Sequence, residues 1–298
     1  MARYGSWNSA WHAAMHRQSH MSTVGSLHSP EIRSRCLLAA ACAILLSGSV
    51  DRARPSLQPL PTVPILMYHH IGDWGPSNPG WSDWVVKPAD FAQQLDWLKS
   101  NGYHTITFRE LLADRQAGRV PAPKSVIISF DDGWSYQGVV IHQELEPRGM
   151  RGVLFVYPGA IARTPNGGGY ISWLELLDLE ANGSEVQSHT LTHPRLTDVQ
   201  QPALDRELRE SRAIIEAQLG HPARVLAYPF GAHDEHVMQA AAAAGYDLAV
   251  RADAEHSATP DGLLRLPRIR VGYGEGLDVF KARMTQAELG VMGSNSGA

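Results

Sequence analysis

Two adjacent carboxylates and two histidines are the residues of this sequence best suited to chemistry. Asp131 and Asp132 directly follow the apolar run 126–130, in Ser-Phe-Asp-Asp-Gly. His189 and His193 come later, in His-Thr-Leu-Thr-His. Carboxylates and imidazoles together suit a hard-to-borderline divalent cation. One aspartate could bind the cation while the other accepts a proton from a metal-bound water, which is the minimum equipment for metal-assisted hydrolysis.

Neither motif carries this inference alone. The chain has 14 histidines, and His12, His16 and His20 repeat the same spacing with no carboxylate partner. Asp-Asp-Gly is also good chemistry for a solvated turn. The apolar residues before the aspartates indicate a core strand instead, so the two motifs support each other as groups at the ends of separate strands.

Two other pairs of side chains could serve the same site. His69 and His70 end an apolar run, and alternation along a strand predicts that one of them faces the interior. That histidine could be a rim residue with one hydrogen bond, or a general acid that protonates a leaving group. Arg268 and Arg270 share a face of a late strand, where one could orient a carboxylate through a forked hydrogen bond, or both could be solvated.

The composition is that of an ordinary globular protein, with 298 residues of which 44% are hydrophobic and 19% charged. A net charge of −4, without a long Lys/Arg run, gives no argument for a nucleic-acid partner. The two cysteines, Cys36 and Cys42, lie in an apolar stretch with arginines before it and small residues after it. This pattern is typical of a secretory signal, with a buried helix as the alternative.

We therefore expect an exported protein, in the periplasm or at the cell surface, that contacts a membrane only through an uncleaved leader. Cleavage near Ser49 would leave no thiolate, so His, Asp or Glu would bind any metal. The expected organisation is a leader (1–50), a Pro-rich linker (51–62), one domain (63–286) and a flexible tail (287–298).

Strand-like and helix-like segments alternate through this domain. Such alternation implies parallel strands covered by helices, and seven or eight strands favour a barrel. The main polar motifs each follow a strand end, and in parallel α/β folds this face carries the site. The predicted strands are 63–71, 104–108, 125–130, 152–157, 185–188, 225–228, 248–251 and 266–271. The predicted helices are 88–100, 109–117, 136–146, 173–181, 202–219, 235–244 and 277–285.

Three motifs in this order, Ser-Phe-Asp-Asp-Gly, His-Thr-Leu-Thr-His and Tyr-Pro-Phe-Gly, resemble those of the polysaccharide deacetylase family, carbohydrate esterase family 4 or the NodB homology domain. The resemblance covers about residues 63–275. It implies a distorted (β/α) barrel of about seven parallel strands and a divalent metal, usually Zn²⁺, with Co²⁺ or Ni²⁺ as alternatives. By motif position it implies Asp132, His189 and His193 as the metal ligands and Asp131 as the general base.

The third motif implies contacts with the substrate. The backbone N–H of Phe230 would help to hold an oxyanion, with Tyr228 of the same motif beside it. An arginine commonly precedes this motif in the family, and here the position is Ala227. Arg268 or Arg270 would have to replace that arginine.

The source of the general acid also departs from the common pattern. The family's late Leu-x-x-x-His motif is not evident after residue 245, and His256 does not fit it. Both departures, with the histidines of the first strand, resemble the branch of poly-β-1,6-N-acetylglucosamine deacetylases. In that branch the acid comes from the start of the domain, which implies His69 as the acid and His70 as the second choice. The branch also implies export.

The resemblance thus implies a metal-dependent hydrolase that removes acetyl groups from N-acetylglucosamine units of a polysaccharide. Two alternatives stay open. One is a carbohydrate-binding or export-assisting protein with weak catalysis on the same fold, and the other is a deacetylase of peptidoglycan or of another amide. The expected partner is a glycan that contains N-acetylglucosamine, and proteins of glycan synthesis or export would be separate chains.

Overall fold

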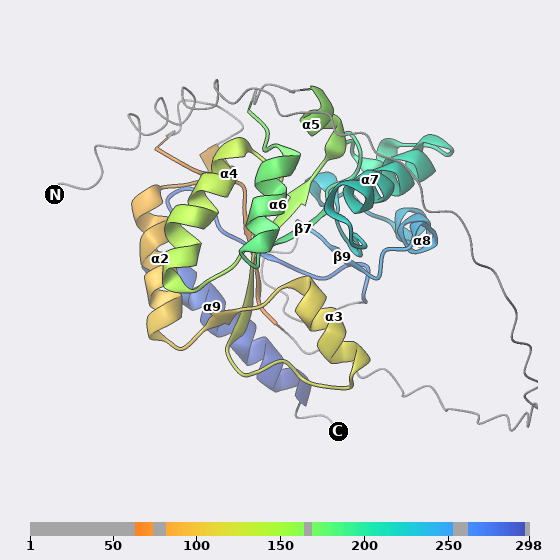
Figure 1. The fold of residues 1–298 in the computed structure, drawn as a ribbon. Coiled ribbons are helices and arrows are strands. Elements are labelled where there is room, and N and C mark those ends of the chain that lie inside the picture. The colour runs from red at the N-terminus through yellow and green to blue at the C-terminus, as the bar shows by residue number, and fades with distance from the viewer. Residues whose placement is uncertain (1–62, 74–81, 164–168, 253–261, 296–298) are drawn as a thin grey trace, which may run out of the picture. The chain divides into compact units, whose positions relative to one another are not determined.

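The computed structural model describes residues 63–73, 82–163, 169–252 and 262–295 (Figure 1). The predicted leader with its two cysteines, the linker and His256 lie outside these residues. Within the described ranges, no helix combines the length and the apolar character that crossing a membrane requires.

Parallel strands form the centre of the fold. They are β1 Ile65–Tyr68, β4 His104–Thr105, β5 Ser125–Phe130, β6 Val153–Val156, β7 Glu185–Ser188, β8 Val225–Ala227, β9 Leu248–Val250 and β10 Ile269–Arg270. Seven pair in the order β10-β1-β5-β6-β7-β8-β9, and β4 pairs with β5. Leu266 bridges Val250 of β9, and Ile269 pairs with Leu66 of β1, so the segment 266–270 connects the two edges of the sheet. The predicted distorted (β/α) barrel of about seven parallel strands is confirmed.

Helices cover the outside of these strands (Figure 1). They are α2 Pro88–Ser100, α3 Phe108–Gln116, α4 Ser135–Val140, α5 Pro158–Arg163, α6 Trp173–Ala181, α7 Ala203–Leu219, α8 Glu235–Ala244 and α9 Leu277–Asn295. The last helix continues past the predicted end at residue 285, through most of the segment predicted as a tail. Trp97 of α2 meets Phe280 of α9 edge to face, with ring centroids 5.9 Å apart, so the start and the end of the domain pack together.

Local sequence signals explain two boundaries that differ from the prediction. The strand predicted at 104–108 ends early because Thr107 caps α3: its hydroxyl accepts from Glu110 N at 3.2 Å, and the Glu110 carboxylate accepts from Thr107 N at 2.8 Å. The helix predicted at 136–146 is α4 followed by a π-helical turn (Ile141–Leu145) and a 3-10 turn (Glu146–Arg148). Pro147 lies in the last turn, and its missing N–H prevents a regular continuation.

The helix α5 and the strand β3 (Val85–Val86) were not predicted. The run predicted as one strand at 63–71 is divided into β1 and β2 (His70–Ile71), and β2 pairs with β3 in a separate two-stranded sheet. Val85–Val86 shows no measurable alternation of its own, so the sequence pattern did not indicate β3. The small sheet matters because β2 follows directly on His69.

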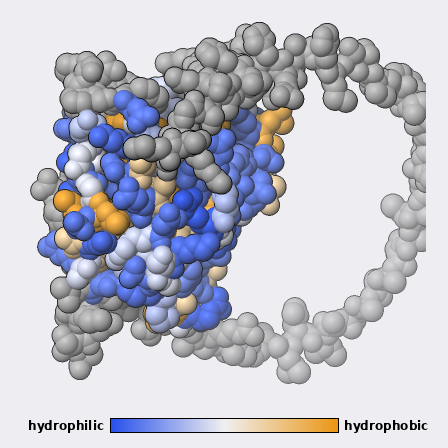
Figure 2. Space-filling model, turned by 90° about the vertical axis from the view of Figure 1, so that its left-hand side faces the viewer, coloured by the Kyte–Doolittle hydropathy of each residue, from blue (hydrophilic) through white to orange (hydrophobic). Residues whose placement is uncertain are grey.

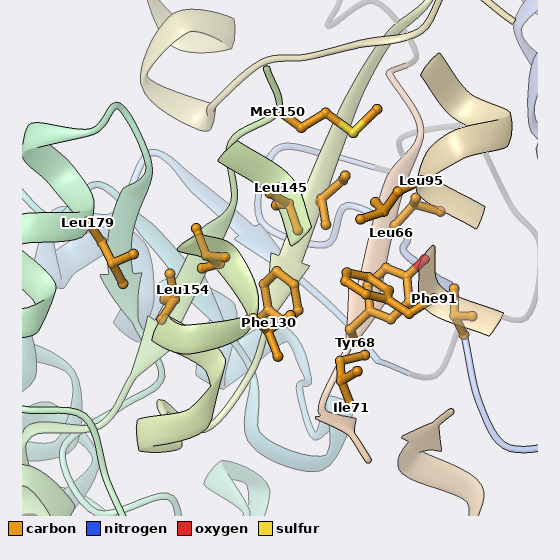
Figure 3. Packing of buried hydrophobic residues seen from close by; sticks show 14 of the residues in the cluster. Leu66, Tyr68, Ile71, Phe91, Leu95, Phe130, Leu145, Met150, Leu154 and Leu179 are labelled. Carbon is orange, nitrogen blue, oxygen red and sulfur yellow. The ribbon is translucent and has the colours of Figure 1, made fainter. Parts of the chain in front are cut away.

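Side chains of the strands alternate between two apolar layers. In β5, Ile127 packs with residues of β1, β6, β8 and β9 inside the barrel. Val126, Ile128 and Phe130 pack on the other side, in a cluster that includes Phe91 of α2 (Figure 3). The odd-numbered residues of β1, β5, β6 and β8 therefore face the interior, and this parity decides which residues beyond the strand ends face the barrel axis.

The surface seen in Figure 2 is predominantly hydrophilic, with hydrophobic residues in small separate groups. Several of the largest side chains are instead fully buried, including Tyr68, Phe108 and Phe155. Burial of aromatic side chains of this size is a main source of the stability of a domain. The framework that carries the strand ends is therefore a packed core rather than an open channel.

Candidate active site and metal centre

Strand parity and register bring the predicted polar residues to one end of the barrel. Asp131 and His69 continue the inward-facing odd positions of β5 and β1, which pair side by side. His189 donates its backbone N–H to the Val156 carbonyl at 2.8 Å, so the pairing of β6 with β7 continues one residue beyond β7. These residues lie at the carboxyl ends of parallel strands, where the sites of such folds form.

Asp132, His189 and His193 bring three potential ligand atoms together. Asp132 Oδ1 lies 3.6 Å from His189 Nε2 and 3.4 Å from His193 Nε2. These distances exceed an ordinary N–H···O hydrogen bond of about 2.9 Å. Four tetrahedral ligands at Zn–N distances of about 2.0–2.1 Å would lie about 3.4 Å from one another. The three side chains therefore fit a zinc-like divalent ion, and all their ligand atoms lie within 4.8 Å of one another.

The protonation of His189 suits a metal ligand. Its Nδ1 lies 2.8 Å from the Ala227 carbonyl oxygen, which can only accept, so Nδ1 carries the hydrogen and Nε2 keeps its lone pair. Burial lowers the pKa of His189 to about 4, which keeps the ring neutral at pH 7. A backbone carbonyl behind a histidine fixes its tautomer and orientation in many metal sites.

Asp131 does not join this cluster but forms a buried ion pair. Arg268 donates from Nη1 to Oδ1 and from Nη2 to Oδ2, both at 2.6 Å, and each residue is 1% exposed. Burial alone would raise the pKa of Asp131, but the charge and the hydrogen bonds of Arg268 hold that pKa below the usual carboxyl value. The structure thus keeps a second carboxylate ionised beside the ligand cluster.

Strained backbone concentrates at this site. Among the described non-glycine residues, positive φ occurs at Asp132 (79°), Thr190 (67°), His193 (65°) and Phe230 (58°), and otherwise only at Lys124. Left-handed conformations of non-glycine residues cost about 1–3 kcal/mol each and persist only where the surroundings enforce them. At Asp132 this conformation turns the side chain away from its strand position, so both aspartates reach the same region.

Trp134 holds the second oxygen of Asp132. Its indole Nε1 donates to Asp132 Oδ2 at 3.2 Å, which leaves Oδ1 directed at the two histidines. Trp134 stacks on Tyr170 with ring centroids 4.5 Å apart. Burial would raise the pKa of Asp132, but His193, His69 and His189 keep it well below the usual range. Asp132 is therefore an anion with one oxygen available to a metal.

The two histidines of the first strand face different surroundings. His69 Nε2 lies 3.8 Å from Asp131 Oδ2, and its ring packs on Trp84 at 4.4 Å between centroids. His70 is 4% exposed and pairs through Nδ1 with the Tyr136 hydroxyl. Burial lowers the pKa of both histidines, to about 4 for His70. Because successive side chains of a strand point to opposite sides, His69 faces the candidate site and His70 faces the side where Tyr136 lies.

Two predicted site residues lie elsewhere. The Tyr228 side chain is fully buried between strand and helices and donates to the Leu264 carbonyl at 2.8 Å, so its ring cannot contact a substrate. Tyr228 is an even-numbered residue after β8, and parity turns it away from the barrel axis. Arg270 does not reach Asp131, because its guanidinium lies over the Trp84 ring at 5.2 Å. Arg268 alone of the two meets the carboxylate.

Phe230 remains at the mouth of the site. Its side chain is 58% exposed, and its ring lies 4.8 Å from the His193 ring. The Arg195 guanidinium lies 5.2 Å from the centre of the Phe230 ring. The Phe230 ring thus lies beside the ligand cluster, and the oxyanion contact of its backbone N–H stays a prediction.

Sequence reasoning missed two residues that support the site. Trp134 lies only two positions after Asp132, and an indole donor so close to a carboxylate was a readable signal. Glu207 of α7 accepts hydrogen bonds from Leu191 N and Thr192 N, between the two histidines. No local pattern marks Glu207, since it looks like any polar residue of an amphipathic helix.

Comparison with known proteins points to one family. Residues 118–249 match the family model described as polysaccharide deacetylase. The chain is 25% identical over 220 residues to YxkH of Bacillus subtilis (strain 168), whose name marks it as a candidate polysaccharide deacetylase; the match covers 74% of this chain and 75% of YxkH.

Two solved structures are similar as well. The deacetylase PplD of Streptococcus pyogenes, in complex with acetate, has a TM-score of 0.69 at 26% identity, covering 76% of this chain and 99% of PplD. The polysaccharide deacetylase BC0361 of Bacillus cereus has a TM-score of 0.64 at 27% identity, covering 74% of this chain and 68% of that one. By motif, family model and fold, this chain carries a polysaccharide deacetylase domain of the NodB homology type, carbohydrate esterase family 4.

Proposed function

We propose that this chain is an exported, metal-dependent N-deacetylase that acts on a polymer of N-acetylglucosamine. One observation carries the proposal: a three-ligand cluster and a second, ionised carboxylate lie side by side at the strand ends. The ligands are Asp132, His189 and His193, and the carboxylate is Asp131, which Arg268 keeps charged.

Each of these residues has a place in amide hydrolysis. A divalent ion held by the three ligands would supply a Lewis acid and lower the pKa of water, and zinc is the first choice for this donor set, with cobalt or nickel as substitutes. Asp131 accepts the proton of the attacking water, because Arg268 orients its oxygens and each oxygen keeps a second lone pair. The Phe230 backbone N–H donates to the acetamide oxygen as negative charge develops there.

His69 completes the proposed reaction. Water adds to the acetamide carbon while Asp131 takes its proton, and the C–N bond then breaks as a proton passes to the departing nitrogen. His69 is the donor in this step. It is neutral at rest, because burial lowers its pKa, and it first takes the proton that Asp131 has accepted, since its Nε2 lies 3.8 Å from Asp131 Oδ2. The products are acetate and a glucosamine unit.

The substrate and the location are inferred from family and sequence. The similar protein PplD was solved with acetate, the acid that deacetylation releases. The departures at Ala227 and in the late histidine motif resemble the poly-β-1,6-N-acetylglucosamine branch, and the apolar stretch at 36–50 favours export. Proteins of glycan synthesis or export would then be its neighbours.

The position of Arg268 bears on the alternative of a binding protein without useful catalysis. That alternative rested on the missing arginine before the third motif and on the missing late histidine. Arg268 provides a guanidinium to Asp131 from a different strand, so a charged partner of the proposed base is present. Peptidoglycan and other amides remain alternative substrates.

Acetate release from defined oligomers tests the proposal. Protein loaded with zinc or cobalt should deacetylate β-1,6-linked N-acetylglucosamine oligomers, faster with longer oligomers, and a chelator should abolish the activity until metal is restored. Asp131→Asn should release no acetate while keeping its metal content. Near-normal turnover of that variant would refute the role of Asp131, and oligomer binding without any acetate release by the wild type would favour the binding protein. Peptidoglycan fragments in the same assay distinguish the alternative substrate.

A further inference from the structure

The loop that carries both histidine ligands holds an unusual backbone. Between His189 and His193, Thr190 has a φ of 67°, and His193 itself has a φ of 65°. Threonine is β-branched, and a positive φ is a genuine outlier for such a residue. Something outside residues 189–193 must therefore hold this loop in the conformation that directs His193 Nε2 at Asp132.

Glu207 of α7 is the charged group that holds this loop through hydrogen bonds. Its Oε2 accepts from Leu191 N at 3.0 Å and from Thr192 N at 2.8 Å, and its Oε1 accepts from the Thr192 hydroxyl at 2.6 Å. Hydrogen bonds to an ionised acceptor are about twice as strong as neutral ones. The carboxylate thus fixes the middle of the loop at three points.

The helix that presents Glu207 is itself attached to the strand before the loop. Ser211, one helical turn after Glu207, lies with its hydroxyl 2.8 Å from that of Ser188, the last residue of β7. The Tyr246 hydroxyl donates to Ser188 Oγ at 2.8 Å and lies 3.0 Å from the Leu208 carbonyl. Residues four apart lie on one face of a helix, so a single face of α7 holds both the strand end and the loop.

Bonds within and around the loop complete the arrangement. His193 N donates to Thr190 Oγ1 at 3.1 Å, so the position of Thr190 sets that of His193. The Leu191 carbonyl accepts from Gly159 N at 2.8 Å, and a Cβ on Gly159 would lie 2.5 Å from that oxygen. The loop is therefore held on one side by the chain at Gly159 and on the other by Glu207.

We infer that Glu207 is a positioning residue for the metal centre: its carboxylate holds the 189–193 loop in the strained form that makes His193 a ligand. This inference rests on the proposed function in one respect, that a divalent metal binds at Asp132, His189 and His193. It adds that the affinity and the geometry of the metal depend on a carboxylate that does not touch it.

Metal binding measures this role separately from catalysis. Competition with a chelator should show zinc bound at least about 10-fold more weakly by Glu207→Ala than by the wild type, the scale typical of residues that support ligands. Glu207→Gln, which keeps one carbonyl acceptor, should lie between the two. The visible spectrum of the cobalt form should change in both variants, because it reports ligand geometry and would not respond to a general loss of stability.

Glu210→Gln is the matched control. Glu210 lies on the same helix, is half exposed and pairs with Arg206 at 3.2 Å, so this change should leave zinc affinity and the cobalt spectrum as in the wild type. If Glu207→Ala does not fold, the zinc affinity and the cobalt spectrum of Glu207→Gln are sufficient to test the inference. Wild-type zinc affinity and an unchanged cobalt spectrum in a folded Glu207 variant would overturn the inference and leave the proposed function intact. A wild type that bound no zinc or cobalt would overturn the proposed metal dependence, and this inference with it.

Discussion

Arg268 and Asp131 form a buried two-point ion pair between segments 137 residues apart in sequence. Arg268 Nη1 also lies 3.3 Å from Ser129 Oγ, its Nε donates to the Arg251 carbonyl at 3.1 Å, and its guanidinium lies 5.5 Å from the centre of the Phe155 ring. The guanidinium therefore sits on top of the apolar interior of the barrel, with its donors directed at acceptors. Such a pair tolerates the loss of one partner poorly, because the remaining charge stays buried.

Replacing Arg268 should change both stability and the pH dependence of activity. Arg268→Met should destabilise the fold by about 3–5 kcal/mol, since Asp131 would be buried without its partner. The pair lowers the pKa of Asp131 in the folded state, so it contributes stability above the unfolded pKa that is lost as the pH falls through the folded pKa. Without Arg268 burial raises this pKa, and the acidic limb of kcat/KM should move to higher pH.

Denaturant melts and pH–rate profiles check this prediction. Arg270→Met is the matched control, because Arg270 lies over Trp84 and does not contact Asp131. It should leave the acidic limb in place. An unchanged acidic limb in a folded Arg268→Met enzyme would show that Arg268 does not set the protonation of the base.

Replacing each of the two histidines at the end of the first strand should have different effects on kcat. His69→Gln should lower kcat by about 100-fold or more, the usual contribution of a general acid, and leave zinc affinity unchanged. His70→Gln should lower kcat far less, because His70 packs against Tyr136 and Trp134 instead of Asp131. Steady-state kinetics with metal analysis measures both effects, and the opposite ranking would assign the acid to His70.

Trp134→Phe should weaken metal binding while the fold is retained. The change removes the N–H that Asp132 Oδ2 accepts at 3.2 Å, so the carboxylate can rotate away from the histidines. A loss of about 10-fold in zinc affinity is expected for a group that orients a ligand. Tyr170→Phe is the control, since it keeps the stacking on Trp134 and removes only the hydroxyl paired with Tyr157. Equal zinc affinities for Trp134→Phe and the wild type would contradict the prediction.

His221 should make stability depend on pH away from the active site. Its Nε2 lies 2.7 Å from Glu180 Oε2, and this hydrogen bond raises the pKa of His221. A raised folded pKa means that the contribution is complete below the unfolded pKa of about 6.5 and is lost as the pH rises through the folded pKa. Pairs at the surface contribute about 0.2–1 kcal/mol, or a Tm difference of at most a few degrees, and this pair is partly buried.

Thermal melts of the wild type and His221→Gln at several pH values test this contribution. The wild type should melt higher at about pH 5.5, and the difference should shrink as the pH rises above the folded pKa. A difference that is constant across this range would show that the pair does not titrate as proposed.

Much of the fold could be read from local pattern. The predicted helices 88–100, 173–181 and 235–244 and the predicted strands 125–130 and 185–188 coincide with α2, α6, α8, β5 and β7. Periodicity and capping residues act over a few positions, so a single sequence contains them. The strand β3 was not predicted, because its two residues show no period.

The sequence by itself also identified the motifs that meet at the strand ends, because parallel strands bring their carboxyl ends to one edge. Only the tertiary structure decided which side chains act together. In the structure, Arg268 and not Arg270 binds Asp131, and the Tyr228 side chain is buried. A positive φ at Asp132 turns its side chain toward His189 and His193. The physical reason is that a local pattern specifies the direction of a side chain within its own element, whereas its partner depends on register and loop conformation set by contacts across the whole domain.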